Sequence, residues 1–353
     1  MVLIMYKYHL EDVEWGRFKV GGKDGIFKVK NSKPYHKSNL TVASNGIPYV
    51  TRTSMNNGLE DLIVDENYEK NPKNTISLGA ENADFFFQGI EYVSGNKMYY
   101  ISNNKITREV GLFLVQIFRQ SIKECGFGYG KGLTGTRFKN RYVMLPIDEN
   151  DEPNWHFMEE YIKERENKQR EVIKEYYKER LNELSTNYNT LTKIDWQEYF
   201  IEDVAEIKSG KDIYERERSK GNTPYITATA NNNGIGYFVG NMNKTLQSKC
   251  ISVNRNGSVG HAFYHSYEAL YGNDTRKLMP FYKNDQTSLF FTCVISNQRE
   301  KYGYGYKMGT GRLKRQKVML PVINGKIDYH YMENYIKNIE KKKIEQILEY
   351  LDR

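Results

Sequence analysis

Two long segments of the chain combine many charged residues with a single stripe of apolar residues at helical spacing. The stripe in residues 155–184 consists of Met158, Ile162, Val172, Ile173, Tyr176, Leu181 and Leu184. The stripe in residues 331–351 consists of Met332, Ile336, Ile339, Ile344, Ile347, Leu348 and Leu351. In the first segment, Glu also precedes Lys or Arg by four residues several times, which favours a helix. We therefore predict two long helices.

The rest of the chain alternates short apolar runs with Gly- and Asn-rich breaks, a pattern typical of strands joined by turns. Residues 97–101, 136–145, 262–264 and 317–320 are such runs. Two apolar stretches, residues 110–122 and 287–296, are long enough to form helices that pack on a sheet. The pattern predicts β-rich globular parts, each with a helix on its sheet.

An internal repeat organises the chain, because six blocks recur in the same order 174 to 177 residues later. Val143-Met-Leu-Pro146 recurs unchanged as Val318-Met-Leu-Pro321. The other blocks pair Ile47–Thr51 with Thr223–Thr227, Asn56–Gly58 with Asn232–Gly234, Ile76–Leu78 with Ile251–Val253, Gly126–Tyr129 with Gly303–Tyr306, and Trp155–Lys163 with Tyr329–Lys337. Chance does not keep order and spacing over six blocks. The chain is therefore two copies of one module.

The repeat and the long helices together predict an α+β fold with a defined domain organisation. Residues 1–152 form the first β-rich domain, residues 153–190 the first long helix and a polar linker, residues 191–327 the second domain, and residues 328–353 the second long helix. Because each helix has one apolar stripe, the two can pair as an antiparallel coiled coil with pseudo-two-fold symmetry. The alternative is that each helix packs only on its own domain.

Composition narrows the class of protein. The chain has 353 residues, 27% of them charged, and its mean hydropathy is −0.73. No apolar run approaches the ~18 residues of a membrane-spanning helix, so we predict no membrane partner. Three widely spaced cysteines without a Cys-x-x-Cys motif predict reduced thiols in a cytoplasmic protein. The net charge of +8 and the 29 tyrosines suggest a polyanionic partner.

The sequence contains no familiar catalytic motif. It lacks a P-loop, a His-Glu-x-x-His metal motif, the Asp/Asn-Pro-Pro-Tyr loop of amino-methyltransferases and the Pro-Asp and acid-x-Lys pattern of metal-dependent nucleases. Glu206-Ile-Lys208 is a bare acid-x-Lys triplet of a kind expected by chance. Gly130–Gly135 matches Gly-x-Gly-x-x-Gly, but a strand, not a helix, is predicted to follow it. We predict no catalytic residue, metal site or cofactor in this chain.

A loop rich in Gly and Tyr, followed by a basic strand, is predicted in each module. Residues 123–141 contain five Lys or Arg against one Glu, and residues 299–317 contain seven against one. Glycines let a backbone approach phosphate, and Lys and Arg neutralise it; the alternative is a solvated surface. The predicted DNA-binding residues are Lys131, Arg137, Lys139, Arg141, Lys307, Arg312, Lys314 and Arg315. We expect Arg137 and Arg312, which match in the repeat, to contact phosphates.

Asn- and Arg-containing loops are further candidates for DNA contact. Their side chains can bind the edges of adenine and guanine with two hydrogen bonds. The predicted residues are Arg52, Asn56, Asn57, Asn232, Asn233, Arg255 and Asn256. We expect Arg255 to read a base and Arg52 to be its weaker counterpart. The alternative is turn chemistry, because Asn-Gly is a common turn pair.

The chain resembles the DNA specificity subunit of bacterial restriction–modification systems. The resemblance rests on two tandem β-rich modules, each closed by a Val-Met-Leu-Pro strand and a long helix, and on the blocks at residues 143–146, 155–163 and 251–264. It is closer to the type IIB and related form than to the commonest type I form, whose Pro-Leu and Glu-Gln helix start is missing here. The modules differ at residues 78–83 and 253–258, so they should read different base sequences.

The resemblance implies two target recognition domains, each reading half of a bipartite site in double-stranded DNA. It implies that the helices space these domains and dock methyltransferase, or fused methyltransferase–nuclease, subunits, two for each specificity subunit. S-adenosylmethionine and Mg²⁺ then belong to those partner subunits. Two other classes stay open from the sequence: a standalone two-domain DNA-binding regulator, and an unrecognised nuclease.

Overall fold

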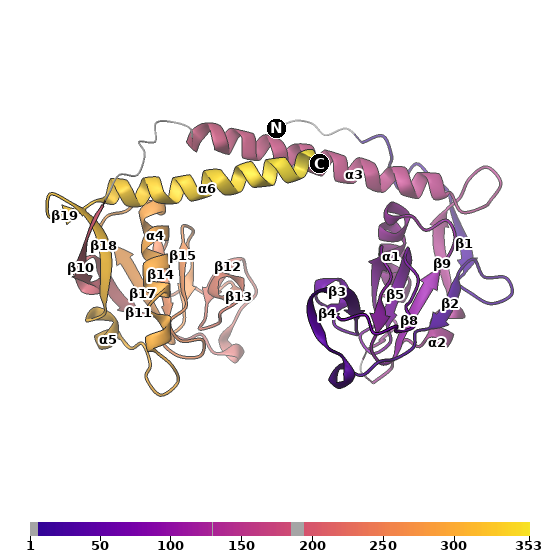
Figure 1. Ribbon diagram of the computed structural model, residues 1–353, viewed down its shortest axis with the longest axis horizontal. Coiled ribbons are helices and arrows are strands. Elements are labelled where there is room, and N and C mark those ends of the chain that lie inside the picture. Colours follow the sequence, from indigo (N-terminus) through magenta and orange to yellow (C-terminus); the bar gives the residue numbers. More distant parts are fainter. Residues whose placement is uncertain (1–5, 129, 185–193) are drawn as a thin grey trace. The chain divides into compact units, whose positions relative to one another are not determined.

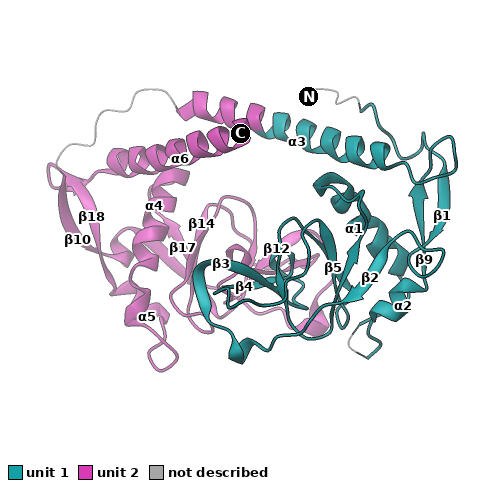
Figure 2. Cartoon of the chain, turned by 45° about the vertical axis from the view of Figure 1, so that its right-hand side comes forward, with its two compact units in different colours: residues 1–173 teal, residues 174–353 magenta. Residues whose placement is uncertain are grey.

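The computed structural model describes residues 6–128, 130–184 and 194–353 (Figure 1). Predictions that concern residues 1–5, Tyr129 and residues 185–193 of the linker lie outside this part of the chain. The chain divides into two compact units, residues 1–173 and 174–353, which contain the first and the second module (Figure 2). Helix α3, Trp155–Leu184, crosses this division.

The described residues of unit 1 form three small sheets. A four-stranded sheet has the order β2-β8-β5-β6, a three-stranded sheet has the order β4-β3-β7, and β1 pairs with β9. The strands are β1 Trp15–Lys19, β2 Lys28–Asn31, β3 Val42–Val50, β4 Leu59–Ile63, β5 Thr75–Gly79, β6 Asp84–Gln88, β7 Val93–Ser94, β8 Met98–Ser102 and β9 Tyr142–Pro146. Strand β3 is antiparallel to β4 and parallel to β7.

Unit 2 repeats this topology. Its sheets have the orders β11-β17-β14-β15, β13-β12-β16 and β10-β18-β19, and β12 is antiparallel to β13 and parallel to β16. The strands are β10 Asp195–Phe200, β11 Ala205–Ser209, β12 Thr223–Ile226, β13 Ile235–Val239, β14 Cys250–Asn254, β15 Ala262–His265, β16 Leu270–Tyr271, β17 Thr275–Pro280, β18 Lys317–Ile323 and β19 Lys326–Ile327. The predicted duplication is therefore present in the fold.

One helix in each module covers the four-stranded sheet, as predicted. Helix α1, Arg108–Ile122, begins at Thr107, whose hydroxyl accepts a hydrogen bond from the Val110 N–H, and buries Leu114 and Phe118 in the core. Helix α4, Asp285–Ser296, begins at Asn284 in the same way and buries Phe290, Phe291 and Ile295. Such side-chain caps satisfy N–H groups that the first helical turn leaves free.

The two long helices form where the apolar stripes predict them. They are α3 and α6, Tyr329–Asp352. Met158, Leu184, Met332 and Ile344 of the stripes are buried, whereas Val172, Tyr176 and Ile339 are exposed, so the stripes are not buried along their whole length. None of the helices in the described residues is both long and apolar enough to cross a membrane.

Within unit 2, ion pairs connect the last part of α3 to α6. Arg180 donates to both carboxylate oxygens of Glu340, at 2.6 and 3.0 Å, and Lys174 lies 2.8 Å from Asp352. The last part of α3 and α6 therefore run in opposite directions within this unit.

Within unit 1, the segment that precedes β1 lies against α3. Glu164 accepts hydrogen bonds from the backbone N–H groups of Lys7 and Tyr8, at 2.6 and 3.0 Å. The Arg165 guanidinium lies 3.4 Å from the centre of the Tyr6 ring. Burial alone would raise the pKa of Glu164, but these donors and the Lys168 ammonium outweigh it and lower the pKa to about 2.

The predicted strand over residues 136–145 is wrong in its first half, as is the matching basic strand in the second module. Helix α2, Gly135–Lys139, precedes β9, and helix α5, Thr310–Lys314, precedes β18. The Thr134 hydroxyl caps α2, and Phe138 and Leu313 anchor the two helices in the cores. A helix of five residues is too short to show a helical period, so its apolar residues suggested a strand.

Candidate nucleic-acid interface

In each module the Gly/Tyr loop is closed by a matching antiparallel bridge. Gly128 pairs with Lys131 in the first module, and Gly303 pairs with Tyr306 in the second. Behind each loop a fully buried side chain, Leu133 or Met308, anchors it in the core. Helices α2 and α5 follow these loops. Lys131 and Lys307 therefore lie in the loops, and the other predicted basic residues lie on the short helices or just after them, not on alternating faces of a strand. Gly130–Gly135 follows α1 and a loop instead of a strand, which is not the context of a dinucleotide site.

Arg137 and Arg312 make the same contact in the two modules. Nη1 of Arg137 donates to the Gly132 carbonyl at 2.6 Å, and Nη1 of Arg312 donates to the Lys307 carbonyl at 2.8 Å. The Arg312 guanidinium also lies 3.9 Å from the centre of the Tyr306 ring. Both arginines are exposed, so each fixes its loop and still presents charge to solvent.

Some of the other predicted basic residues bind groups of the protein itself, and others have side chains that are exposed and unpaired. Lys131 donates to the Cys125 carbonyl, and Arg141 donates to the Ser121 carbonyl and contacts the Cys125 sulfur. Lys314 lies 3.5 Å from Glu202, and Lys307 lies 5.3 Å from the ring of Tyr304. The side chains of Lys139 and Arg315 are exposed and have no hydrogen-bond or ion-pair partner among the described residues.

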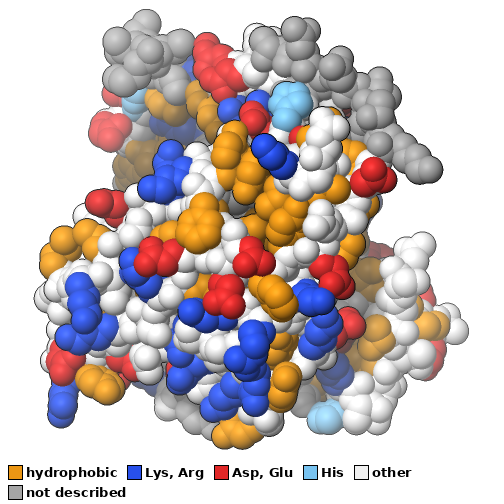
Figure 3. All heavy atoms as spheres, turned by 90° about the vertical axis from the view of Figure 1, so that its left-hand side faces the viewer, with side chains coloured by type: hydrophobic (Ala, Val, Ile, Leu, Met, Phe, Trp, Pro, Cys, Tyr) orange, Lys and Arg blue, Asp and Glu red, His pale blue; other side chains and the backbone are white. Residues whose placement is uncertain are grey.

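Charge is unevenly distributed over the surface of unit 2. Figure 3 shows that Lys and Arg side chains gather at the end of the unit away from α6, where α5 and the Gly/Tyr loop lie. Tyr304 and Tyr306 are exposed there. Exposed tyrosine hydroxyls can donate to phosphate oxygens of DNA while the neighbouring cations neutralise the phosphate charge.

The two Asn-Asn-Gly turns have one backbone conformation. Asn56 and Asn57 have φ of 49° and 56°, and Asn232 and Asn233 have φ of 50° and 52°. The second Asn holds the turn against the neighbouring strand: Asn57 Nδ2 donates to the Phe87 carbonyl at 2.9 Å, and Asn233 Nδ2 donates to the Tyr264 carbonyl at 3.4 Å. Asn233 Nδ2 also lies 3.1 Å from the Tyr267 hydroxyl, which accepts from it. Asn57 and Asn233 thus have the structural role that turn chemistry predicts, while Asn56 and Asn232 present their side chains to solvent.

Three loops meet beside each turn, and we call this place the loop corner. It consists of residues 51–54, 80–82 and 95–97 in the first module and residues 227–230, 255–258 and 272–274 in the second. Matching backbone hydrogen bonds join these loops, from Ala80 N to Lys97 O at 3.1 Å and from Arg255 N to Asp274 O at 2.8 Å. The two corners are therefore equivalent in structure.

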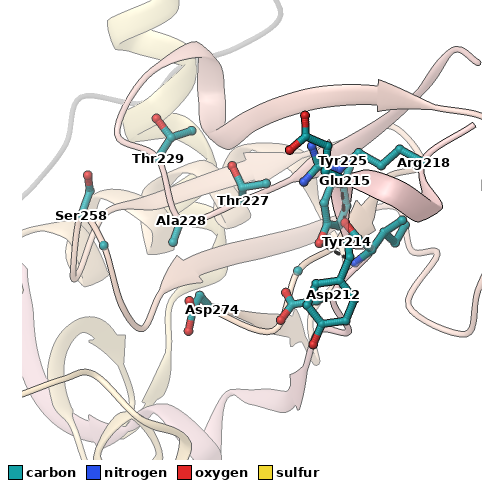
Figure 4. A pocket seen from close by; sticks show the side chains of 13 residues that line it. Asp212, Tyr214, Glu215, Arg218, Tyr225, Thr227, Ala228, Thr229, Ser258 and Asp274 are labelled. Carbon is teal, nitrogen blue, oxygen red and sulfur yellow. Dashed lines mark hydrogen bonds between the residues drawn. The ribbon is translucent and has the colours of Figure 1, made fainter. Parts of the chain in front are cut away.

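A cavity lies at each loop corner. The cavity in unit 1 has a volume of about 650 Å³ and is lined by Tyr49, Thr51, Arg52 and Thr53 among others. The cavity in unit 2 has a volume of about 680 Å³ and is lined by the matching residues Tyr225, Thr227, Ala228 and Thr229 (Figure 4). The frame is shared, whereas the charged residues around it differ.

Both arginines that we predicted to read bases are held by a carboxylate at the loop corner. Arg52 pairs with Glu81, which also pairs with Lys97. Arg255 Nη2 donates to Asp274 Oδ1 at 2.8 Å, and Asn256 Nδ2 lies 3.4 Å from Asp274 Oδ2. Sequence reasoning missed Glu81 and Asp274. A seventh repeated block, Gly95-Asn-Lys97 and Gly272-Asn-Asp274, was the signal that could have drawn attention to Asp274.

Among the described residues, no group of three or more His, Cys, Asp or Glu side chains could hold a metal ion. The candidate interface consists of cations, amides, hydroxyls and aromatic rings on a duplicated frame, with one carboxylate bound to an arginine at each corner. These groups suit the recognition of a nucleic acid.

Comparison with known proteins identifies the class. The family model described as the type I restriction modification DNA specificity domain matches residues 13–175 and 193–349. The chain belongs to this family: it is a specificity subunit of a restriction–modification system, with two target recognition domains and a non-catalytic role in DNA recognition.

One relative agrees with this assignment, and one solved structure shows a similar fold. The chain is 31% identical over 325 residues to S.BcgI, the specificity subunit of a type II restriction enzyme of Heyndrickxia coagulans, covering 90% of this chain and 93% of the relative. The fold also matches the crystal structure of a type I restriction–modification S subunit from M. genitalium, with a TM-score of 0.55, 17% identity, and coverage of 97% and 93% of the two chains.

Proposed function

We propose that this chain reads a bipartite double-stranded DNA site, with one target recognition domain on each half. The observation that carries the proposal is the loop corner, which has the same backbone frame in both modules and different charged residues on it. A shared frame positions equivalent loops in the same way, and different side chains select different bases. The two halves of the site are therefore expected to differ in sequence.

The Gly/Tyr loops supply the part of binding that does not depend on sequence. Arg137, Lys139, Arg312 and Arg315 are exposed cations on matching loop–helix segments, and we assign them to phosphates. Phosphate contacts fix the register of a protein on DNA, and contacts to base edges specify the sequence. Arg52, Asn56, Asn232 and Arg255, near the loop corners, are assigned to bases.

The long helices are proposed to set the spacing of the half-sites. An antiparallel coiled coil of α3 and α6 is supported by the pairs Arg180–Glu340 and Lys174–Asp352. At the start of each helix the stripe packs on its own module instead, because Met158 and Met332 belong to the two module cores. We propose that this coil docks two methyltransferase, or fused methyltransferase–nuclease, subunits in the cytoplasm. S-adenosylmethionine and Mg²⁺ would be held by those subunits.

Methylation mapping with the reconstituted complex tests the proposal. The specificity subunit, combined with its methyltransferase partner and S-adenosylmethionine, should modify a site made of two short specific halves around unspecified base pairs. Removing one heptad from each long helix should change the length of that spacer and leave the half-sites unchanged. A continuous site, or an unchanged spacer, would contradict the proposal. Specific methylation or cleavage by the purified chain alone would instead favour an enzyme.

A further inference from the structure

The two loop corners carry different charges at equivalent backbone positions. The matching hydrogen bonds place Ala80 and Lys97 of the first module where Arg255 and Asp274 lie in the second. Two more backbone hydrogen bonds match between the modules: Gly95 N donates to Val50 O at 3.0 Å, and Gly272 N donates to Ile226 O at 2.9 Å. The loop that follows β3 or β12 therefore has the same position in both corners. The two corners therefore have the same backbone arrangement and different side chains.

In spite of this difference, each corner contains one arginine bound to one carboxylate. In the first module the arginine, Arg52, follows β3 and its carboxylate, Glu81, lies on the β5–β6 loop. In the second module the arginine, Arg255, lies on the β14–β15 loop and its carboxylate, Asp274, precedes β17. Position 228, which matches Arg52, is an alanine. The arginine thus comes from a different loop in each module.

These pairs contribute little to folding. The Arg255 and Asp274 side chains are 31% and 44% exposed, and those of Arg52 and Glu81 are 36% and 21% exposed. Ion pairs at such exposure are typically weak, because water screens the charges. Their effect on the arginine is geometric, because a carboxylate that accepts from one donor restricts the orientations that the planar guanidinium can take.

A guanidinium held in this way keeps donors for a ligand. Asp274 accepts from Arg255 Nη2, and Arg255 Nη1 makes no hydrogen bond within the described part of the chain. Two N–H donors of an oriented guanidinium match the O6 and N7 acceptors on the major-groove edge of guanine. Arg52 and Glu81 line the cavity of the first module, and Asp274 lines the cavity of the second, so these three side chains border open space.

We infer that Glu81 and Asp274 are positioning residues, which orient Arg52 and Arg255 so that each arginine reads one guanine in its half of the DNA site. The inference rests on the proposed function. Because the arginines come from different loops, the guanine is expected at a different place in each half-site. The carboxylates do not contact the base themselves.

The test uses the complete complex and duplexes that carry 7-deazaguanine, which lacks the N7 acceptor, at each guanine of the mapped site in turn. The parent complex should bind one such duplex per half-site about tenfold or more weakly than the natural duplex. Arg255→Ala should abolish this penalty in the half-site of the second module only. Arg255→Lys, which keeps the charge but not the planar fork, should abolish it as well.

Asp274→Asn separates positioning from a general structural role. It should reduce the 7-deazaguanine penalty to less than about threefold and leave the preference at other base pairs unchanged. Glu81→Gln should do the same in the other half-site. Glu198→Gln is the matched control, because it breaks an exposed ion pair with Lys317 (2.6 Å) away from the corner; it should keep the full penalty.

Several outcomes would overturn the inference. Asp274→Asn could weaken binding to all duplexes equally and keep the penalty, Arg255→Lys could retain it, or a half-site could show no sensitive guanine. Failure of the proposed function looks different, because the parent complex would then have no sequence preference at all. Hydrogen exchange of β14 and β17 in the second-module variants, and of β5 and β8 in Glu81→Gln, establishes that the substituted module is folded.

Discussion

The two modules hold the same Asn-Asn-Gly turn with different side chains. In the first module Gln88 Nε2 donates to the Ser77 hydroxyl at 3.2 Å and to the Asn57 carbonyl at 3.1 Å. In the second module His265 occupies the place of Gln88: its Nε2 lies 2.8 Å from the hydroxyl of Ser252, which matches Ser77.

His265 reaches the turn through a second contact. Its Nδ1 lies 3.1 Å from the Tyr267 hydroxyl, which accepts from Asn233. Gln88 and His265 each satisfy the buried polar groups around them, so either residue can hold the Asn-Asn-Gly turn in place beside the loop corner. They differ in one property: imidazole binds a proton in a pH range where a glutamine amide does not.

The largest expected effect is therefore a pH dependence confined to the second module. Burial lowers the pKa of His265 from 6.5 to about 4. Between these values the unfolded chain binds a proton that the folded module excludes, so stability falls as pH falls. The loss should reach about 3 kcal/mol below pH 4 and be absent above about pH 6.5.

Unfolding at several pH values, followed by hydrogen exchange in β14 and β15, measures this loss. His265→Gln copies the first module and should remove this contribution to the pH dependence, whereas His330→Gln on the surface of α6 should not. A first module that loses as much stability over the same range would show that His265 is not the cause.

A second comparison concerns the glycines of the two turns. Gly58 has φ of +77° and Gly234 has φ of +76°, and an added Cβ would lie 3.1 Å from Phe86 or 3.2 Å from Phe263. Alanine at either position should cost about 1–3 kcal/mol of unfolding free energy, because L-residues are strained at this φ. Denaturant unfolding measures both variants. If the two variants lose unfolding free energies that differ by more than about 1 kcal/mol, the surroundings of the two turns differ although their dihedral angles agree.

A third comparison concerns the matching arginines of the Gly/Tyr loops. Arg137→Ala and Arg312→Ala should each weaken binding of the complex to cognate, mismatched and random duplexes alike. Loss of one phosphate contact should flatten the log–log salt dependence by about one. Binding at several salt concentrations tests this. If neither variant differs from the parent, the Gly/Tyr loops are not the phosphate-binding surface, and Arg137 and Arg312 only brace their loops.

The smallest expected effect is local and belongs to the first module. Glu164→Gln weakens the acceptor for the backbone N–H groups of Lys7 and Tyr8, so these amides should exchange faster. The pKa of Glu164 is lowered to about 2, so in the parent the protection is full above about pH 4.5 and is lost as pH falls toward 2. Glu333→Gln on α6 is the control. Unchanged exchange at both amides would mean that other contacts hold the segment.

The sequence alone determined the architecture, because the signals were long or repeated. Both long helices, the helices that cover the sheets and the duplication were predicted, and so was the family. A periodic apolar stripe, or a block that recurs at a constant spacing, can be recognised in the sequence without knowing which residues are neighbours in space.

Only the tertiary structure decided which candidate side chains are exposed and unpaired and which are bound to another residue of the chain. Arg52 and Glu81 are 29 residues apart, Arg255 and Asp274 are 19 residues apart, and no local pattern connects either pair. Helices α2 and α5 are too short for a period, and the equivalence of Gln88 and His265 depends on strands that meet in space. Side-chain pairing is a property of packing, so residues far apart in the chain acquire their roles only when the sheets bring their loops together.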